Sequence, residues 1–209
     1  LFLQFNLMVD EINTRDKILK AYNLDLKSLV DDTSEKLEKV SILATTDALT
    51  GLYNRRYLMD TFDTMIKSAQ IKQEPLGIIM LDIDHFKSVN DSLGHNTGDL
   101  VLKVVADLLQ NNARADNIVG RIGGEEFLIL CPNCDTQRTF DIAQRIREKI
   151  ATTVINYEEG KTTQVQVSSG IYSAIPELSK EELLKIADDA LYLSKKNGRN
   201  KVTIGEIRN

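Results

Sequence analysis

Cysteine and histidine are scarce in this chain, with two of each among 209 residues. Cys131 and Cys134 form a Cys-x-x-Cys pattern, but a zinc site needs a second pair of ligands. The histidines, His85 and His95, lie elsewhere in the sequence. We therefore interpret the two cysteines as reduced thiols at a strand end, which predicts a reducing, cytoplasmic location.

Long apolar stretches and basic runs are also missing. No segment reaches the roughly 20 apolar residues of a membrane span, so we expect no membrane contact by this segment. The net charge is −5 without a basic run, which argues against nucleic-acid binding. The chain starts with Leu1, and we expect it to be a piece of a longer protein, for which membrane anchoring stays open.

Glycine and proline are absent before residue 46. There, apolar side chains recur at two heptad positions, with interruptions at Arg15, Thr33 and Lys36. The repeating residues are Ile12, Leu19, Leu26 and Val40 at one position, and Tyr22, Leu29 and Leu43 at the other. The pattern predicts a parallel coiled coil of two chains, and a single amphipathic helix packed on its own domain is the alternative. We predict an α-helical stalk over residues 1–45 and a separate domain over residues 46–209.

Beyond residue 46, apolar runs separated by turn residues predict an α/β domain. Helices are expected over residues 54–70, 99–110, 136–150 and 179–197, the last opened by a capping box of Ser179 and Glu182. Strands are expected over residues 76–83, 118–122, 125–131, 164–169 and 201–204. Gly123 and Gly124 would form the tight turn of a hairpin. These elements predict a mixed, mainly antiparallel central sheet flanked by helices.

Acidic residues stand at two predicted strand ends. Asp82 and Asp84 end an apolar strand, where an unpaired buried carboxylate is costly, although surface charges are the ordinary alternative. Glu125 and Glu126 are adjacent in the hairpin turn, where like charges repel unless a cation compensates. If the two strands are neighbours, Asp82 and Glu125 can share Mg²⁺, which prefers one or two carboxylates plus substrate phosphates.

The segment Gly123-Gly124-Glu125-Glu126-Phe127 resembles the defining motif of the GGDEF family of diguanylate cyclases, in its Glu variant. The resemblance continues in the family's order from about residue 45 to the end, through residues 47–56, 82–91, 94–99, 167–171 and 187–200. It implies a fold similar to the polymerase palm and the nucleotide cyclases. It also implies an enzyme of bacterial signal transduction that condenses two GTP into cyclic di-GMP and two pyrophosphates.

The resemblance implies a metal site whose ligands are the Asp82 carboxylate, the Ile83 carbonyl and the Glu125 carboxylate. Glu126 would be a further, weaker catalytic contributor. Two Mg²⁺ ions, with Mn²⁺ as a substitute, would lie about 4 Å apart and stabilise the attacking 3′-hydroxyl and the leaving pyrophosphate. Glu125 could also help to deprotonate that hydroxyl, although metal coordination alone could lower its pKa.

Guanine recognition is implied for Asn90 and Asp99. A carboxylate accepts from the N1–H and the exocyclic amine of guanine and is mismatched to adenine, so Asp99 favours GTP. A helix N-cap after Gly98 is the other role of Asp99. A cyclase that makes a mixed GMP–AMP dinucleotide is correspondingly disfavoured.

Phosphate binding is implied for the backbone around Asp84–Lys87, which includes His85 and Phe86, and for the cations Lys195 and Arg199. Without the resemblance, Lys195 and Arg199 would be ordinary cations near a helix C-terminus. The side chains of His85 and His95 are interpreted as loop and packing groups. Arg121 is interpreted as a structural or interfacial cation.

One chain supplies one such site, whereas the product needs two nucleotides joined twice. Two catalytic domains must therefore face each other head to tail, and a dimeric stalk would raise their effective concentration. We expect a homodimer controlled by an upstream sensor domain. Two rival interpretations remain: a degenerate module that binds nucleotide without turnover, and an inert domain on a coiled coil.

Many members of the family carry an inhibitory product site, Arg-x-x-Asp, before the glycine pair. Here Arg114 is present, but Asn117 replaces the aspartate. An asparagine can bond a guanine edge, yet it lacks the charge to meet Arg114 and the guanine donors together. This degenerate site predicts weak or absent product inhibition.

Overall fold

The computed structural model describes residues 40–207 together with residues 8, 15, 19–20, 22–23, 25–27, 29–30, 32–33 and 36. The chain divides into two compact units, Leu1–Ala44 and Thr45–Asn209. Every described residue of the first unit is helical. No helix among the described residues is both long enough and apolar enough to cross a bilayer.

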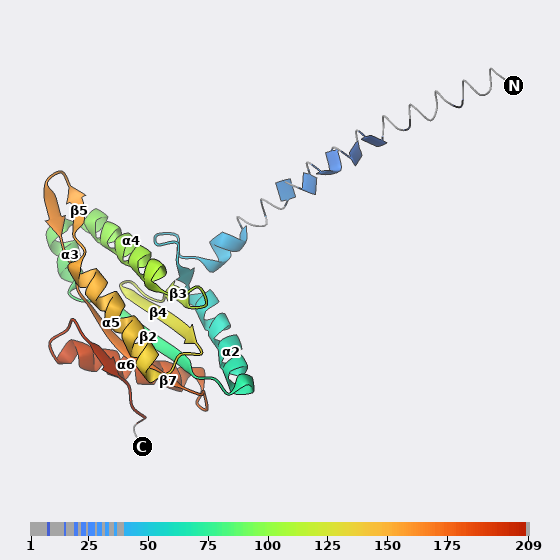
Figure 1. Cartoon of the computed structure of the whole chain (residues 1–209). Helices are drawn as coiled ribbons and strands as arrows, with labels where there is room; N and C mark the ends of the chain where they lie inside the picture. Colours follow the sequence, from blue (N-terminus) through green and yellow to red (C-terminus); the bar gives the residue numbers. More distant parts are fainter. Residues whose placement is uncertain are drawn as a thin grey trace. The chain divides into compact units, whose positions relative to one another are not determined.

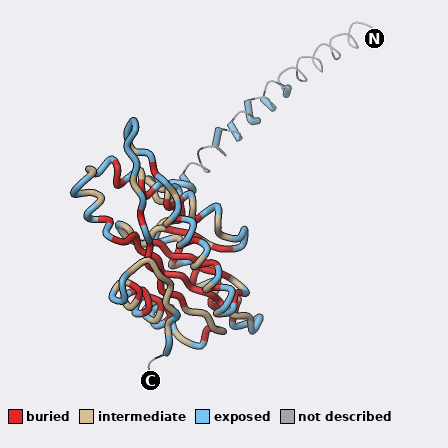
Figure 2. The backbone as a smooth tube through the Cα atoms, turned by 60° about the vertical axis from the view of Figure 1, so that its left-hand side comes forward, coloured by how far each residue is buried: buried red, intermediate tan, exposed pale blue. Residues whose placement is uncertain are grey.

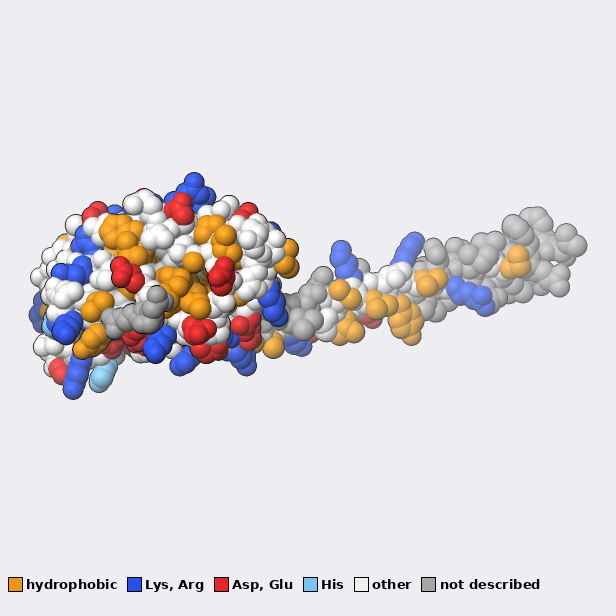
Figure 3. Space-filling model, turned by 90° about the horizontal axis from the view of Figure 1, so that it is seen from below, with side chains coloured by type: hydrophobic (Ala, Val, Ile, Leu, Met, Phe, Trp, Pro, Cys, Tyr) orange, Lys and Arg blue, Asp and Glu red, His pale blue; other side chains and the backbone are white. Residues whose placement is uncertain are grey.

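The described apolar residues of the heptad pattern are exposed on the helical unit, as Figure 3 shows. They are each more than half exposed: Leu19, Tyr22, Leu26, Leu29, Val40 and Leu43. Ile12 lies outside the described residues. Since apolar side chains of this size are normally buried, the stripe is consistent with a second helix in contact with it. The coiled coil stays a prediction.

The second unit is built on a six-stranded sheet of order β1-β3-β4-β2-β7-β8 (Figure 1). Its strands are β1 (Tyr53–Asn54), β2 (Leu76–Ile83), β3 (Ile118–Arg121), β4 (Glu126–Pro132), β7 (Val167–Ala174) and β8 (Val202–Ile204). The three pairs among β3, β4, β2 and β7 are antiparallel, and the edge strands β1 and β8 pair in parallel. A separate hairpin joins β5 (Ile155–Glu158) to β6 (Lys161–Thr163).

Helices cover both faces of this sheet. They are α2 (Arg55–Lys72), α3 (Phe86–Leu93), α4 (His95–Asn112), α5 (Thr136–Thr152) and α6 (Lys180–Lys196). Side chains of α4 and α5 share one apolar cluster with the sheet, and those of α2 and α6 share another on the opposite face. The predicted mixed, mainly antiparallel sheet flanked by helices is therefore confirmed.

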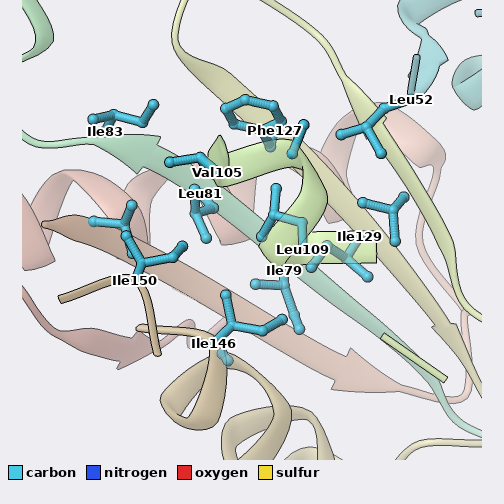
Figure 4. Close-up of a cluster of buried hydrophobic side chains, with 14 of the residues drawn as sticks. Leu52, Ile79, Leu81, Ile83, Val105, Leu109, Phe127, Ile129, Ile146 and Ile150 are labelled. Atoms are coloured by element: carbon cyan, nitrogen blue, oxygen red, sulfur yellow. The ribbon is translucent and has the colours of Figure 1, made fainter. Parts of the chain in front are cut away.

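The core lies on both sides of β2, whose eight residues are all buried. Figure 4 shows one cluster, in which Leu81 and Ile79 of β2 lie among side chains of β4, α4 and α5. Figure 2 shows the buried backbone concentrated along the central strands. Each fully buried Leu, Ile or Phe contributes about 1.5–3 kcal/mol, so the apolar run of β2 anchors the domain.

Local sequence signals explain where the main helices begin. The side chains of Asn54 and Asp135 accept hydrogen bonds from the Tyr57 and Arg138 amides, which cap α2 and α5. Ser179 and Glu182 form the predicted capping box of α6. The predicted hairpin of β3 and β4 is also present, with Arg121 opposite Phe127.

Three local predictions were wrong or incomplete, and two further elements were not predicted. Residues 86–93, expected as loop, form α3, whose three apolar residues Phe86, Val89 and Leu93 recur at helical spacing over only eight residues. The helix expected at residue 99 begins at His95, because Gly94 adopts φ +84 between the two helices. Strand β7 overlaps the predicted strand only at residues 167–169 and continues to Ala174, and the sequence did not reveal β1 or the β5–β6 hairpin.

Candidate active site

The predicted acidic residues meet at one edge of the sheet. Asp82 of β2 and Glu126 of β4 are directly opposite each other in the antiparallel ladder. The Ile83 amide donates a hydrogen bond of 3.3 Å to the Glu125 carbonyl. The strand carrying Asp82 is therefore the neighbour of the hairpin, as the shared metal site requires.

Asp82 is the most strongly perturbed acid of this edge. Its side chain is 6% exposed, and burial raises its pKa to about 6. The neighbouring charges of Glu125 and Glu126 raise this pKa further, while the Lys195 ammonium opposes the increase. Lys195 Nζ lies 2.7 Å from Asp82 Oδ2. The Lys195 ammonium thus pairs with the Asp82 carboxylate, which is buried beside two other acidic residues.

The donor set fits a hard divalent cation completed by substrate. Among the described residues, no three His, Cys, Asp or Glu side chains form a metal cluster by themselves. Mg²⁺ does not need such a cluster, because it is usually held by one or two carboxylates plus phosphates and water. The Asp82 and Glu125 oxygens with the Ile83 carbonyl could hold it, and Lys195 already stands beside Asp82 as the cation that balances its charge.

Arg121 fixes the turn that carries the glutamates. Its Nε donates to the carbonyls of Gly123 and Gly124, its Nη2 donates to Gly124 at 2.7 Å, and its Nη1 bonds Asp47 at 3.1 Å. Burial pulls the pKa of Asp47 upward, but hydrogen bonds from Thr50 and Arg121 outweigh it and lower that pKa. Arg121 is thus a structural cation within the domain.

The residues predicted to recognise guanine lie on two packed helices, α3 and α4. Asn90 is half-buried on α3, and Asp99 is exposed in the second turn of α4. A Cβ on Gly98 would lie 1.9 Å from Asn90 Oδ1, so the Asn90 amide rests directly on this glycine. Asp99 does not cap α4, since Gly94 holds the N-cap position, and its carboxylate is free of that role.

The predicted phosphate loop is the start of α3. His85 adopts φ +58 at the N-cap of α3, and the first amides of a helix have no partner within it. The Asp84 amide is already bonded to the Gln166 carbonyl at 2.9 Å, which leaves His85–Lys87 as the amides suited to phosphate. The Phe86 side chain is buried in the core, whereas Lys87 is exposed.

The cations Lys195 and Arg199 reach the same edge from the end of α6 and the following turn. Lys195 pairs with Asp82, and Arg199 Nε lies 4.0 Å from Asp84 Oδ1. The Asp84 carboxylate also accepts hydrogen bonds from Ser168 and Asn200. The sequence did not reveal Ser168 or Asn200, because both are far from Asp84 along the chain.

The degenerate inhibitory pair lies at the other end of β3. Arg114 is exposed, whereas Asn117 is buried, and neither polar atom of the Asn117 side chain has a hydrogen-bond partner. Arg114 Nη1 instead contacts Cys134 Sγ at 3.9 Å. Cys131 and Cys134 are free and buried, and they hydrogen-bond to each other, which raises the pKa of Cys131 and lowers that of Cys134 to about 6.

Comparison with known proteins agrees with this arrangement of an acidic sheet edge and a helix-flanked sheet. Residues 44–201 match the family described as "Diguanylate cyclase, GGDEF domain". The chain is 37% identical over 169 residues to a probable diguanylate cyclase of Escherichia coli, DgcT, covering 80% of this chain and 37% of that protein. It is also 37% identical over 178 residues to the response regulator PleD of Caulobacter vibrioides, covering 84% and 39% of the two chains.

Solved structures show the same relationship. The crystal structure of the coiled coil and GGDEF domain of DgcB from Caulobacter crescentus, in complex with c-di-GMP, superimposes with a TM-score of 0.82 at 33% identity. It covers 90% of this chain and 99% of that one. The fold is a mixed α/β domain with a central sheet flanked by helices, as in these GGDEF domains. The chain belongs to the GGDEF family of diguanylate cyclase domains, and it spans well under half the length of these curated relatives.

Proposed function

We propose that residues 46–209 form a diguanylate cyclase that condenses two GTP into cyclic di-GMP and two pyrophosphates. The main support is the arrangement of acids at one edge of the sheet. Asp82 pairs with Glu126 across β2 and β4, Glu125 is next to Glu126, and Lys195 forms an ion pair with Asp82. Burial raises the pKa of Asp82, the neighbouring Glu125 and Glu126 carboxylates raise it further, and the Lys195 ammonium opposes the increase. Such an edge suits a metal–triphosphate substrate.

Each group of residues has a distinct task in this reaction. Asp82, Glu125 and the Ile83 carbonyl would hold two Mg²⁺ ions, or Mn²⁺, and Glu126 would add negative charge beside them. Bound metal supplies Lewis-acid stabilisation of the 3′-oxygen and of the leaving pyrophosphate. Glu125 would help to accept the proton of the 3′-hydroxyl, unless metal coordination alone lowers the pKa of that hydroxyl enough. His85, Phe86 and Lys87 offer backbone amides to the phosphates, with Lys195 and Arg199 supplying positive charge.

Specificity for GTP rests on α3 and α4. Asn90, held against Gly98, and the exposed Asp99 carboxylate offer the acceptors that guanine's N1–H and amine need. Adenine presents an acceptor at N1, which leaves Asp99 without a donor. We expect GTP to be cyclised and ATP to be refused, since a site built around hydrogen bonds rejects a mismatched base strongly.

Each domain holds one nucleotide, so the productive enzyme is a homodimer with the two acidic edges facing each other. The exposed stripe of the helical unit, which includes Leu26 and Leu29, would pair two stalks and raise the local concentration of domains. An upstream sensor domain would act through that stalk in a cytoplasmic enzyme. No role for nucleic acid or for membrane contact by this segment is proposed.

The test is product analysis with the full chain. The protein is incubated with GTP and Mg²⁺ and the nucleotides are separated by chromatography, alongside Glu125→Gln. Glu159→Gln, an exposed glutamate of the β5–β6 turn, is the matched control. Cyclic di-GMP from the parent and the control, but not from Glu125→Gln, supports the proposal. GTP bound without product at high protein concentration would favour a non-catalytic binding module.

The dimer is tested separately by disrupting the stripe. Leu26→Asp with Leu29→Asp should yield monomers and lower the turnover per chain at dilute protein, because burying two carboxylates in a helix seam is unfavourable. Turnover should recover as the protein is concentrated. Lys27→Asp, off the stripe, is the control, and mass photometry with a rate assay gives both readouts. Unchanged turnover in dilute monomers would contradict the head-to-tail dimer.

A further inference from the structure

Asp84 is a buried carboxylate that the proposed chemistry does not use. Its side chain is 2% exposed and lies two residues beyond Asp82, between β2 and α3. A buried carboxylate is costly unless donors surround it. Asp84 Oδ1 accepts from the Ser168 hydroxyl at 2.7 Å, and Oδ2 accepts from the Asn200 amide at 2.9 Å. The carboxylate therefore joins the end of β2 to β7 and to the turn after α6.

The turn after α6 needs such an anchor. Arg199 and Asn200 are consecutive non-glycine residues with φ of +61° and +46°, a left-handed conformation that L side chains disfavour. The Arg199 amide bonds the Ser194 carbonyl at 3.0 Å, and Arg147 of α5 bonds Asn200 Oδ1 at 2.9 Å. Asp84 supplies the bond to the Asn200 amide, so it fixes the backbone at the second strained residue.

This backbone determines where the Arg199 side chain points. The direction of the Cα–Cβ bond follows from φ and ψ, so an unstrained turn would redirect the guanidinium. Asp84 also attracts the guanidinium directly, since Nε lies 4.0 Å from Oδ1. Among the described residues, no hydrogen bond uses the terminal nitrogens of Arg199, and these remain available for a forked contact with phosphate oxygens.

We infer that Asp84 is a positioning residue for the triphosphate: it holds the Arg199–Asn200 turn in its left-handed form and orients the Arg199 guanidinium toward the phosphates. The inference rests on the proposed cyclase function, because it takes Arg199 as a phosphate ligand. Asp84 itself touches neither metal nor substrate in this assignment. Its effect on nucleotide binding must therefore pass through Arg199.

A double-mutant cycle on the full chain tests this path. The variants are Asp84→Asn, Arg199→Ala and the double variant, and the probe is 3′-deoxy-GTP with Mg²⁺, which lacks the attacking hydroxyl and cannot turn over. Affinity is measured by calorimetry. Each single change is expected to weaken binding about tenfold, the value of a hydrogen bond to a charged group, and the double change no more than either alone. Losses that multiply would overturn the inference.

Two controls separate positioning from general damage. Asp60→Asn, an exposed acid of α2, should leave the affinity for 3′-deoxy-GTP unchanged. Hydrogen exchange of the Asn200 amide, measured without nucleotide, should speed up in Asp84→Asn but not in Asp60→Asn. An unchanged exchange rate would overturn the anchoring role. If Asp84→Asn does not fold, Ser168→Ala, which removes one hydrogen-bond partner of Asp84, replaces it in the cycle with Arg199→Ala. Ser168→Ala alone is expected to weaken binding about two- to threefold and to add nothing to the loss from Arg199→Ala.

Failure of the two proposals is distinguishable. If the parent makes cyclic di-GMP but the affinity losses of Asp84→Asn and Arg199→Ala multiply in the double variant, only the proposed role of Asp84 is refuted. If the parent neither binds 3′-deoxy-GTP nor makes cyclic di-GMP, both the proposed cyclase function and the role of Asp84 are refuted.

Discussion

The two ends of strands β2 and β4 belong to one ladder but differ in chemistry. At one end, Leu76 faces Pro132 and Gly77 faces Cys131, so no acidic residue stands in this part of the pairing. At the other end, Asp82 faces Glu126, the Glu125 charge is close by, and Lys195 pairs with Asp82. The first end closes the core. The acidic end concentrates negative charge that the fold alone does not neutralise. Along the same two strands, one end therefore contributes to stability and the other to the proposed chemistry.

The largest expected effect comes from removing charge at the acidic end. Asp82→Asn should lower turnover of GTP by at least about a thousandfold, because it removes a metal ligand that the transition state needs. The amount of cyclic di-GMP per enzyme and minute is the measurement. Asp60→Asn should match the parent. Turnover of Asp82→Asn within tenfold of the parent would place the metal site elsewhere.

The next effect is on stability and follows from the pKa of Asp82. Its pKa rises from 3.8 to about 6 on folding, mainly by burial, so the folded state binds the proton more tightly. The stabilising contribution is full below about pH 3.8 and is lost as pH rises to about 6, a change of at most about 3 kcal/mol. Denaturant unfolding of the metal-free chain across this window measures it.

Asp82→Asn serves as the comparison for that pH series. The variant should lack this part of the pH dependence and should be more stable than the parent at pH 7 without metal. Parallel stability curves for the parent and Asp82→Asn would show that burial does not perturb this carboxyl. In the expected outcome, the single substitution Asp82→Asn lowers activity and raises stability at pH 7. That result would show that the acidic end of the strands serves catalysis at a cost in stability.

Two glycines give a matched pair of smaller effects. A Cβ at Gly98 would strike Asn90 Oδ1, and a Cβ at Gly77 would lie 2.3 Å from Thr139 Oγ1 of α5. Gly98→Ala should weaken 3′-deoxy-GTP binding about tenfold by displacing a guanine ligand. Gly77→Ala should instead cost about 1–3 kcal/mol of unfolding free energy by overpacking and leave binding by folded molecules unchanged. If Gly98→Ala and Gly77→Ala weakened 3′-deoxy-GTP binding equally, the distinction between a binding role for Gly98 and a packing role for Gly77 would be refuted.

The smallest expected effect concerns product inhibition. Asn117→Asp restores the acid of the inhibitory motif beside Arg114, and we expect inhibition by cyclic di-GMP to strengthen about three- to tenfold, as a charge-assisted bond would provide. The parent should show weak or absent inhibition. Initial rates at increasing cyclic di-GMP give the inhibition constants of both. Tight inhibition of the parent, in the low micromolar range, would contradict the prediction.

The sequence predicted those parts of the fold that local patterns determine. The apolar run of β2, the Gly123-Gly124 turn and the capping box of Ser179 and Glu182 each carry their signal within a few residues. The signal of helix α3 is weaker, because only Phe86, Val89 and Leu93 mark its apolar side within eight residues. Its boundary with α4 depends on the positive φ of Gly94, which the sequence permits without requiring.

Contacts between distant segments were beyond the reach of local patterns. The bonds of Asp84 to Ser168 and Asn200 span 84 and 116 positions, and the pairing of Lys195 with Asp82 likewise joins α6 to β2. The motif resemblance supplied Lys195 and Arg199 as candidates, but not the carboxylates that they face.

Strand β2 is hydrogen-bonded on both sides over nearly its whole length, to β4 and to β7. An acid at the end of the most tightly held strand of a sheet has little freedom to approach or leave a substrate on its own. If two such domains must meet around their nucleotides, the adjustable quantity is how often whole domains encounter each other. Activity would then be controlled by how often two rigid domains meet, and not by a change of shape within either domain.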